Sequence, residues 1–275
     1  MTQRKRSVFL ISDRTGVTVE MLGHSLLTQF DQIKFERRTC PFVDTTEKVQ
    51  AIVAEINQVA QEESERPLVF STLVNPVHRK LLISANAKVL DLFKTFMDDL
   101  EAEFSLPANH TIGLSHGLAD TEKYQCRIEA VNYSINHDDG ITSHNLSRAD
   151  LILLGVSRCG KTPTCLYLAL QYGIRAANYP LIPEDLERMR LPDSLKPHRH
   201  KLYGLSIQPD RLAEIREERR PNSKYASISN CITEVEDAET LFKRERIPFI
   251  NTTFKSIEEI ASTIIHQSKL KRRVY

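Results

Sequence analysis

The chain has few cysteines, and their spacing is not that of a metal site or a disulfide framework. The five thiols form no Cys-x-x-Cys pair and no even, closely spaced set; they are Cys40, Cys126, Cys159, Cys165 and Cys231. Structural zinc sites and disulfide-stapled secreted domains both need such spacings. The sequence therefore argues against both and favours a reducing compartment. It also contains no internal repeat and no low-complexity tract.

Long hydrophobic runs are absent as well. The apolar segment 8–11 near the N-terminus is too short for the core of a signal peptide, and Asp13 and Arg14 follow it at once. No stretch approaches the apolar length of a membrane span. We therefore expect a cytoplasmic protein with no membrane partner.

Neither sign of charge dominates the composition. The 37 Lys and Arg residues balance 36 Asp and Glu residues, which gives a formal net charge of +1. Nucleic-acid binders usually carry a strong basic field, so we expect no nucleic-acid partner. With 275 residues, 41% of them hydrophobic, the chain has material for one large domain or two ordinary ones.

Strand-like and helix-like segments alternate along most of the chain. In the N-terminal part we expect strands over 8–11, 34–40 and 67–71, and helices over 17–30, 45–62, 77–87 and 89–104. In the C-terminal part we expect strands over 151–154, 174–177, 201–207 and 247–250, and helices over 121–135, 162–172, 209–220, 234–246 and 256–267. This alternation favours an α/β fold in which helices cover parallel sheets.

A break in the pattern at 105–110, where turn formers replace the apolar period, indicates a domain boundary or a long connection. We predict an N-terminal α/β domain over 1–105, a connecting region over 106–148, and a P-loop NTPase-like domain with a parallel sheet over 149–275. The stretch 180–197 contains four prolines, which break any long helix and indicate an ordered loop or lid beside the site.

The most informative motif is a phosphate-binding loop pattern. An apolar run at 151–154 precedes it directly, so strand, glycine turn and helix start come in the order that phosphate binding requires. A chance match is expected on the order of once in several hundred such chains. The pattern predicts that nucleotide or polyphosphate is bound by Gly155, Val156, Ser157, Arg158, Cys159, Gly160, Lys161 and Thr162.

At four of these positions, phosphate binding directly explains the type of residue. A Cβ at Gly155 or Gly160 would obstruct either the turn or the approach of the phosphate. Lys161 can reach the outer phosphates, and Thr162 can offer its hydroxyl to Mg²⁺.

Two further loop residues are open to more than one interpretation. Arg158 can neutralise phosphate charge during transfer, or it can form a surface ion pair, and the sequence favours neither. Cys159 is interpreted as a small loop residue rather than a nucleophile, since no dedicated base lies near it in the sequence.

The candidates for acid–base or metal chemistry outside the loop are Asp13, His116, Asp138 and Asp139. Asp13 follows the first strand, where ligands collect in open α/β sheets, although capping of the next helix by Thr15 or Thr18 explains this segment equally well. His116 lies in a glycine-flanked loop, where a solvated histidine is the ordinary alternative.

Asp138 and Asp139 belong to the His-Asp-Asp-Gly segment 137–140. Neighbouring carboxylates can coordinate Mg²⁺ or accept a hydroxyl proton, but a helix that ends at Gly140 explains the same residues. No aspartate ends a clear apolar strand after the loop. Any Mg²⁺ would therefore be held by Thr162 and a non-standard acid.

Segments along the whole chain resemble the family of bacterial phosphoenolpyruvate synthase regulatory proteins. They occur in collinear order at 11–18, 137–140, 155–164, 176–180, 215–220 and 223–227. Related regulators act on pyruvate, phosphate dikinase. The resemblance implies a bifunctional enzyme that phosphorylates a threonine of phosphoenolpyruvate synthase with ADP as donor, which inactivates the target. It also implies the reverse activity, in which inorganic phosphate removes the group and pyrophosphate is released.

The resemblance further implies that the 155–162 loop binds ADP and phosphate, with Lys161 as the main charge clamp. Asp13, His116, Asp138 and Asp139 are then candidates for general base or metal ligation. The N-terminal domain, which has no nucleotide motif, is hypothesised to help dock the protein target. A homo-oligomer is compatible with the sequence. A small-molecule kinase and a nucleotide-sensing module without turnover are the alternative functions.

Overall fold

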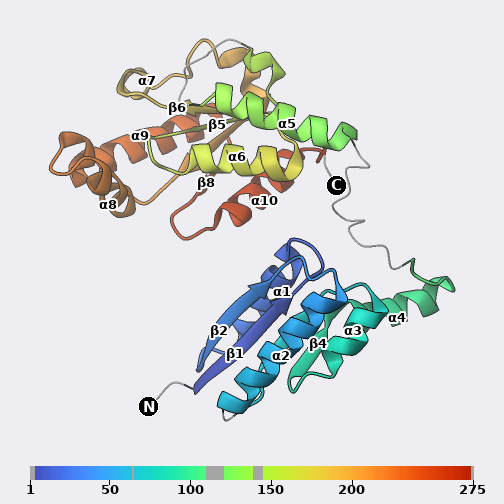
Figure 1. Ribbon diagram of the computed structural model, residues 1–275. Coiled ribbons are helices and arrows are strands. Elements are labelled where there is room, and N and C mark those ends of the chain that lie inside the picture. The colour runs from blue at the N-terminus through green and yellow to red at the C-terminus, as the bar shows by residue number, and fades with distance from the viewer. Residues whose placement is uncertain (1–3, 64, 110–120, 139–144, 274–275) are drawn as a thin grey trace. The chain divides into compact units, whose positions relative to one another are not determined.

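The computed structural model describes residues 4–63, 65–109, 121–138 and 145–273 (Figure 1). The chain forms two compact units, Met1–Gly117 and Leu118–Tyr275. Each unit has a four-stranded parallel sheet with helices packed on it, so the expected α/β fold is confirmed. Within the described ranges, no helix combines the length and the apolar character that crossing a membrane requires.

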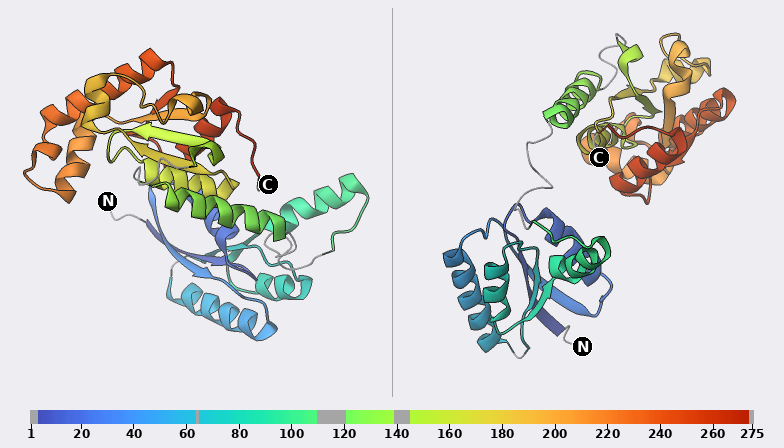
Figure 2. Two further views of the ribbon diagram at one scale, coloured as in Figure 1. Left: turned by 90° about the horizontal axis from the view of Figure 1, so that it is seen from above. Right: turned by 90° about the vertical axis from the view of Figure 1, so that its right-hand side faces the viewer.

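In the first unit, strands and helices alternate from end to end. The elements are β1 (Arg4–Ile11), α1 (Val17–Leu27), β2 (Ile33–Cys40), α2 (Thr46–Glu62), β3 (Leu68–Ser71), α3 (Pro76–Ile83), β4 (Lys88–Asp91) and α4 (Leu92–Phe104). Successive residues of β1 point to opposite faces of the sheet. Phe9 and Ile11 share a core with α2 and α3, whereas Val8 and Leu10 share one with α1. Helices therefore cover both faces, as Figure 2 shows for this unit.

The second unit is built around a second parallel sheet. Its elements are α5 (Thr121–Asn136), β5 (Leu151–Gly155), α6 (Lys161–Tyr172), β6 (Ala176–Pro180), α7 (Pro183–Arg188), β7 (Leu202–Ser206), α8 (Pro209–Arg219), α9 (Ile228–Glu245), β8 (Phe249–Asn251) and α10 (Ile257–Ser268). Short 3-10 turns lie at Leu146–Arg148, Lys196–Lys201 and Lys224–Ala226. Helix α5, which lies within the predicted connecting region, packs against α6 and β6 of this unit.

Helices cover both faces of the second sheet as well. The hydroxyl of Tyr203 in β7 donates to Gln267 of α10, whereas a Cβ on the next residue, Gly204, would lie 2.7 Å from the Phe242 ring of α9. Because neighbouring strand residues face opposite sides, α9 and α10 lie on opposite faces. Gly204 thus allows α9 to pack closely on the sheet.

The two sheets have the same strand order. The order is β2-β1-β3-β4 in the first unit and β6-β5-β7-β8 in the second, with every pair parallel. In each sheet the first strand is flanked by the second and third, so the direction of winding reverses beside it. Ligands of open α/β sheets bind at this switch point, beyond the carboxyl ends of the strands. The loop that follows β5 therefore lies where a ligand is expected.

One local expectation is wrong, and the structure refines two others. The single helix expected over 89–104 is instead strand β4 followed by α4, because a short apolar run fits a buried strand as well as a helix. Asp91 ends the strand and accepts the Lys94 N–H as the cap of α4. The proline-rich stretch 180–197 contains α7, which Pro183 begins, since proline is tolerated in the first helical turn. The residue that precedes α1 is Gly16, with no side-chain cap from a threonine.

Candidate functional site

The 155–162 loop joins β5 to α6 in the predicted order of strand, turn and helix. A Cβ on Gly155 would lie 2.5 Å from the Leu205 carbonyl oxygen and 2.6 Å from the Cys159 sulfur, so this position has no room for a side chain. Gly160 has a φ of +94°, which favours glycine, and nothing lies within 4 Å of its missing Cβ. The first glycine is thus required by packing, and the second leaves open space above the loop.

Donors from several elements hold the carbonyl groups of this loop. The pairs are Val156 with the Lys161 ammonium at 2.8 Å, Ser157 with Arg216 at 3.2 Å, Cys159 with the Thr252 hydroxyl at 3.1 Å, and Gly160 with the Thr164 hydroxyl at 2.8 Å. In a trans peptide the N–H points opposite to the C=O. Arg216 and Thr252 are buried, so the N–H groups of Arg158 and Gly160 point away from the protein interior. These two N–H groups have no acceptor among the described residues.

Lys161 places a cation at the base of the loop. Its side chain is 5% exposed, and its ammonium group has no carboxylate partner in the described part of the chain. Burial of a charge without a counter-ion is costly, so such a lysine is best explained by an anion that binds beside it. The free N–H groups and this ammonium group together form a strong candidate for an anion site.

Asp138 reaches the loop from the end of α5. Its Oδ1 accepts a hydrogen bond from the Thr162 hydroxyl at 2.7 Å and another from the Asn178 side-chain amide at 2.6 Å. The Asn178 amide also donates to the Thr162 hydroxyl at 3.1 Å, and its own Oδ1 is buried with no hydrogen-bond partner among the residues that the structure describes. Three polar groups, from the segment after α5, from α6 and from β6, thus meet at the start of α6.

A cavity of about 660 Å³ opens beside the loop. This volume lies within the usual range for small-molecule sites. Its lining combines the loop with β6, α8 and the turn after α8; the residues are Asp138, Ser157, Arg158, Gly160, Lys161, Thr162, Pro163, Asn178, Pro180, Ile215, Arg219, Arg220 and Tyr225.

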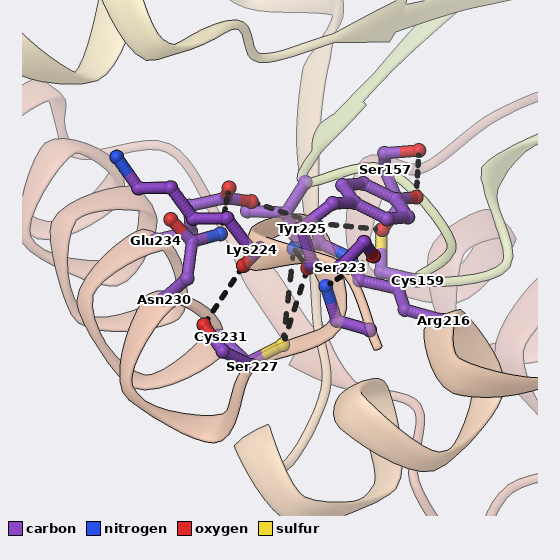
Figure 3. A network of polar contacts seen from close by, with 12 residues as sticks. Ser157, Cys159, Arg216, Ser223, Lys224, Tyr225, Ser227, Asn230, Cys231 and Glu234 are labelled. Atoms are coloured by element: carbon purple, nitrogen blue, oxygen red, sulfur yellow. Dashed lines mark hydrogen bonds and ion pairs between the residues drawn. The ribbon is translucent and has the colours of Figure 1, made fainter. Parts of the chain in front are cut away.

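Arg216 is the centre of a polar network behind the loop (Figure 3). Its fully buried guanidinium donates to the Ser157 and Tyr225 carbonyls, at 3.2 and 3.1 Å, and pairs with Glu234 at 2.6 Å. It also lies 4.2 Å from the centre of the Tyr225 ring, and the Tyr225 hydroxyl lies 2.9 Å from the Ser157 hydroxyl. The network therefore connects the loop to α8, to the 3-10 turn at 224–226 and to α9.

We expect that Arg216→Met will lower the free energy of unfolding by about 3 kcal/mol, because it leaves Glu234 without its cation and two carbonyls without a donor. Urea denaturation measures this change. Arg211→Met is the matched control, since Arg211 is exposed in the same helix and its pair with Glu214 is at the surface. A loss below about 1 kcal/mol for Arg216→Met would show that the network does not stabilise the fold.

The environment of Cys159 supports the interpretation of this residue as a structural one. Burial raises the pKa of the Cys159 thiol, although the nearby Lys161 ammonium acts in the opposite direction. The thiolate is the nucleophilic form of cysteine, and here it is disfavoured. All five cysteines are free.

Comparison with known proteins identifies the family. The model of the kinase/pyrophosphorylase family matches residues 8–265. The chain belongs to this family. Curated relatives bear the provisional name phosphoenolpyruvate synthase regulatory protein. One from Alkalilimnicola ehrlichii is 56% identical over 275 residues, 100% of both chains, and one from Laribacter hongkongensis is 56% identical over 270 residues, 98% of both. One from Pseudomonas aeruginosa is 52% identical over 271 residues, 98% of this chain and 99% of the relative.

The structure describes some of the predicted site residues and places them in both units. Lys161, Thr162 and Asp138 line one cavity in the second unit. Ser157, Arg158 and Gly160 of the loop line it too, whereas Gly155, Val156 and Cys159 do not. Asp13 is a buried residue of the first unit, where it accepts a hydrogen bond from the Val74 N–H at 2.9 Å. This bond gives Asp13 a structural function within its own unit, and its catalytic role stays a prediction. His116, Asp139 and Gly140 lie outside the described residues.

Asn178, Arg216 and Tyr225 are residues of the site, or contact it, that were not predicted from the sequence. Their segments contribute to the family resemblance, but none belongs to the loop motif. Asn178 had one further signal, since it is a polar residue that directly follows the strand expected over 174–177. Arg216 had no such signal, because the sequence of a charged helix does not indicate which of its arginines is buried.

The described residues contain no cluster of three or more His, Cys, Asp or Glu side chains that could hold a metal. Thr162 and Asp138 are nevertheless suitable for Mg²⁺, which prefers oxygen ligands and usually keeps several waters. Their 2.7 Å contact brings two such oxygens together beside the loop. The residues thus fit Mg²⁺ bound jointly by protein, water and phosphate.

Proposed function

We propose that this protein is a bifunctional regulator of phosphoenolpyruvate synthase. In one direction it transfers the β-phosphoryl group of ADP to a threonine of the synthase and inactivates it. In the other, inorganic phosphate removes that group as pyrophosphate and restores activity. The observation that carries the proposal is the buried ammonium of Lys161 beneath the loop, which has no carboxylate partner among the described residues. The family and the names of the relatives supply the target.

Phosphoryl transfer depends mainly on position and charge neutralisation, which this cavity can provide. The loop N–H groups and Lys161 would hold the transferred phosphoryl group. Thr162 and Asp138 would hold Mg²⁺, which when bound would neutralise charge on the phosphate oxygens. The threonine proton would pass to a base among the remaining candidates, Asp13, His116 and Asp139.

A cytoplasmic location belongs to the same proposal. The five free cysteines fit a reducing compartment, and the synthase would have to be reached there. The first unit would help to dock the synthase, as hypothesised from its lack of a nucleotide motif.

A transfer assay with purified components tests the proposed function. The protein is incubated with phosphoenolpyruvate synthase and ADP labelled in the β-phosphate, and we expect label on a synthase threonine and loss of synthase activity. Addition of inorganic phosphate should then release labelled pyrophosphate. Label on a small metabolite in a cell extract would support the small-molecule kinase instead. Saturable ADP binding without any transfer would support the sensing module.

A further inference from the structure

The cavity beside the loop carries more positive charge than one phosphoryl group needs. Its described lining includes four cationic side chains, Arg158, Lys161, Arg219 and Arg220, but only one carboxylate, Asp138. The formal net charge of the whole chain is +1, so this concentration is local. Such a cavity attracts a polyanion with several negative charges.

Two of these cations belong to a wall that is separate from the loop. Arg219 is the last residue of α8 and Arg220 follows it, while Ile215, one turn earlier, lines the same cavity. Residues four apart share a helix face, so the end of α8 forms one side of the cavity. The dipole of α8 favours cations at this end, but it does not require them to line a cavity.

The side chains of Arg219 and Arg220 are exposed, and neither has a carboxylate partner in the described ranges. Arg211, in the same helix, is by contrast paired with Glu214 at 2.7 Å. A guanidinium group without a partner can bind a phosphoryl group through two parallel hydrogen bonds. The α8 wall therefore offers a second anion seat in the same cavity as the loop's own donors.

We propose that Arg219 and Arg220 form a second phosphoryl subsite, which holds the phosphoryl group that is not transferred. This inference rests on the proposed function. In the forward direction the threonine oxygen bonds to the β-phosphorus of ADP and the bond from that phosphorus to the bridging oxygen breaks. The electron pair stays with the phosphate of AMP, and the threonine proton passes to a base. The α8 arginines hold the AMP phosphate.

The reverse direction uses the same two seats. An oxygen of inorganic phosphate bonds to the phosphorus of phosphothreonine, and the bond from that phosphorus to the threonine oxygen breaks. The threonine oxygen takes up the proton that the attacking phosphate loses, and the product is pyrophosphate. Inorganic phosphate therefore occupies the seat of the ADP α-phosphate. One cavity serves both directions because ADP and pyrophosphate share a P–O–P unit.

Binding of pyrophosphate and of phosphate, measured by calorimetry at 0.15 M salt, tests the subsite without any target protein. The wild-type protein should bind pyrophosphate at least about tenfold more tightly than phosphate, since only pyrophosphate fills both seats. Arg219→Gln/Arg220→Gln should remove this preference. Phosphate affinity should change by no more than about twofold, because without a phosphothreonine bound the loop seat with Lys161 remains open to free phosphate. Arg211→Gln removes the same charge from the same helix and should leave the preference intact.

Three outcomes would overturn the subsite: a wild-type protein without the preference, a double variant that keeps it, or an Arg211→Gln variant that loses it equally. A different outcome would refute the proposed function. A wild-type protein that shows the preference, loses it in the double variant and yet transfers nothing from ADP to the synthase would refute the regulator and leave the subsite established. A double variant that transfers from ADP normally and keeps the preference for pyrophosphate would refute the subsite and support the proposed function.

Discussion

Lys161→Met is expected to abolish phosphoryl transfer in both directions and to leave the folded protein at least as stable as the wild type. Methionine fills the volume of the lysine stem, while the buried charge, for which the described part of the chain offers no carboxylate partner, disappears. We expect transfer to fall by a factor on the order of 10³, the scale seen when one preorganised donor to a developing charge is removed. Initial rates with labelled ADP measure the first effect, and urea denaturation measures the second.

The two readouts of this variant separate function from folding. A lysine that serves mainly to stabilise the loop would give a less stable protein, because the Val156 carbonyl would lose its donor. Lys196→Met is the control, since Lys196 is an exposed lysine paired with Asp193 on the surface. Transfer by Lys161→Met within about threefold of the wild type would show that the loop assignment is wrong.

Asp138→Asn should also lower transfer strongly, by a factor on the order of 10² to 10³. The substitution keeps the shape of the side chain but removes the negative charge beside the Thr162 hydroxyl. An amide is a weaker ligand for Mg²⁺ than a carboxylate, so the variant should need more Mg²⁺ to reach its own maximal rate. Rates measured across a Mg²⁺ titration show both effects.

Asp193→Asn is the matched control for Asp138→Asn. Asp193 is an exposed carboxylate whose contact with Lys196 lies outside the cavity, so its loss should leave the rate and the Mg²⁺ requirement unchanged. An Asp138→Asn variant with the wild-type Mg²⁺ requirement would remove Asp138 from the metal site. An unchanged rate would remove it from the chemistry altogether.

The sequence predicts most of this fold because its signals are local. Apolar periods locate the helices, and the loop pattern 155–162 contains its strand, its glycines, its lysine and its helix start within a dozen residues. The strand β4 was missed because Val89 and Leu90 are too short a run to distinguish a strand from a helix. Pairing with β3 decides that case, and such a pairing is not visible in a local window.

The candidate site could be predicted only where one segment supplies it. Arg216 contacts Ser157 across 59 positions of sequence, and Tyr225 contacts it across 68. Asn178 and Asp138 meet across 40 positions. These contacts depend on how helices pack on the sheet, so residue type and spacing do not indicate them.

The hydrogen bond from the Thr252 hydroxyl to the Cys159 carbonyl has a consequence for the synthesis of the chain. These residues are 93 positions apart, and Thr252 follows the last strand of the sheet. A ribosome-bound chain that already exposes Gly155, Gly160 and Lys161 therefore still lacks the Thr252 hydroxyl that holds the loop. Competence to bind an anion should arise only after residue 252 has left the ribosome and β8 has joined the sheet.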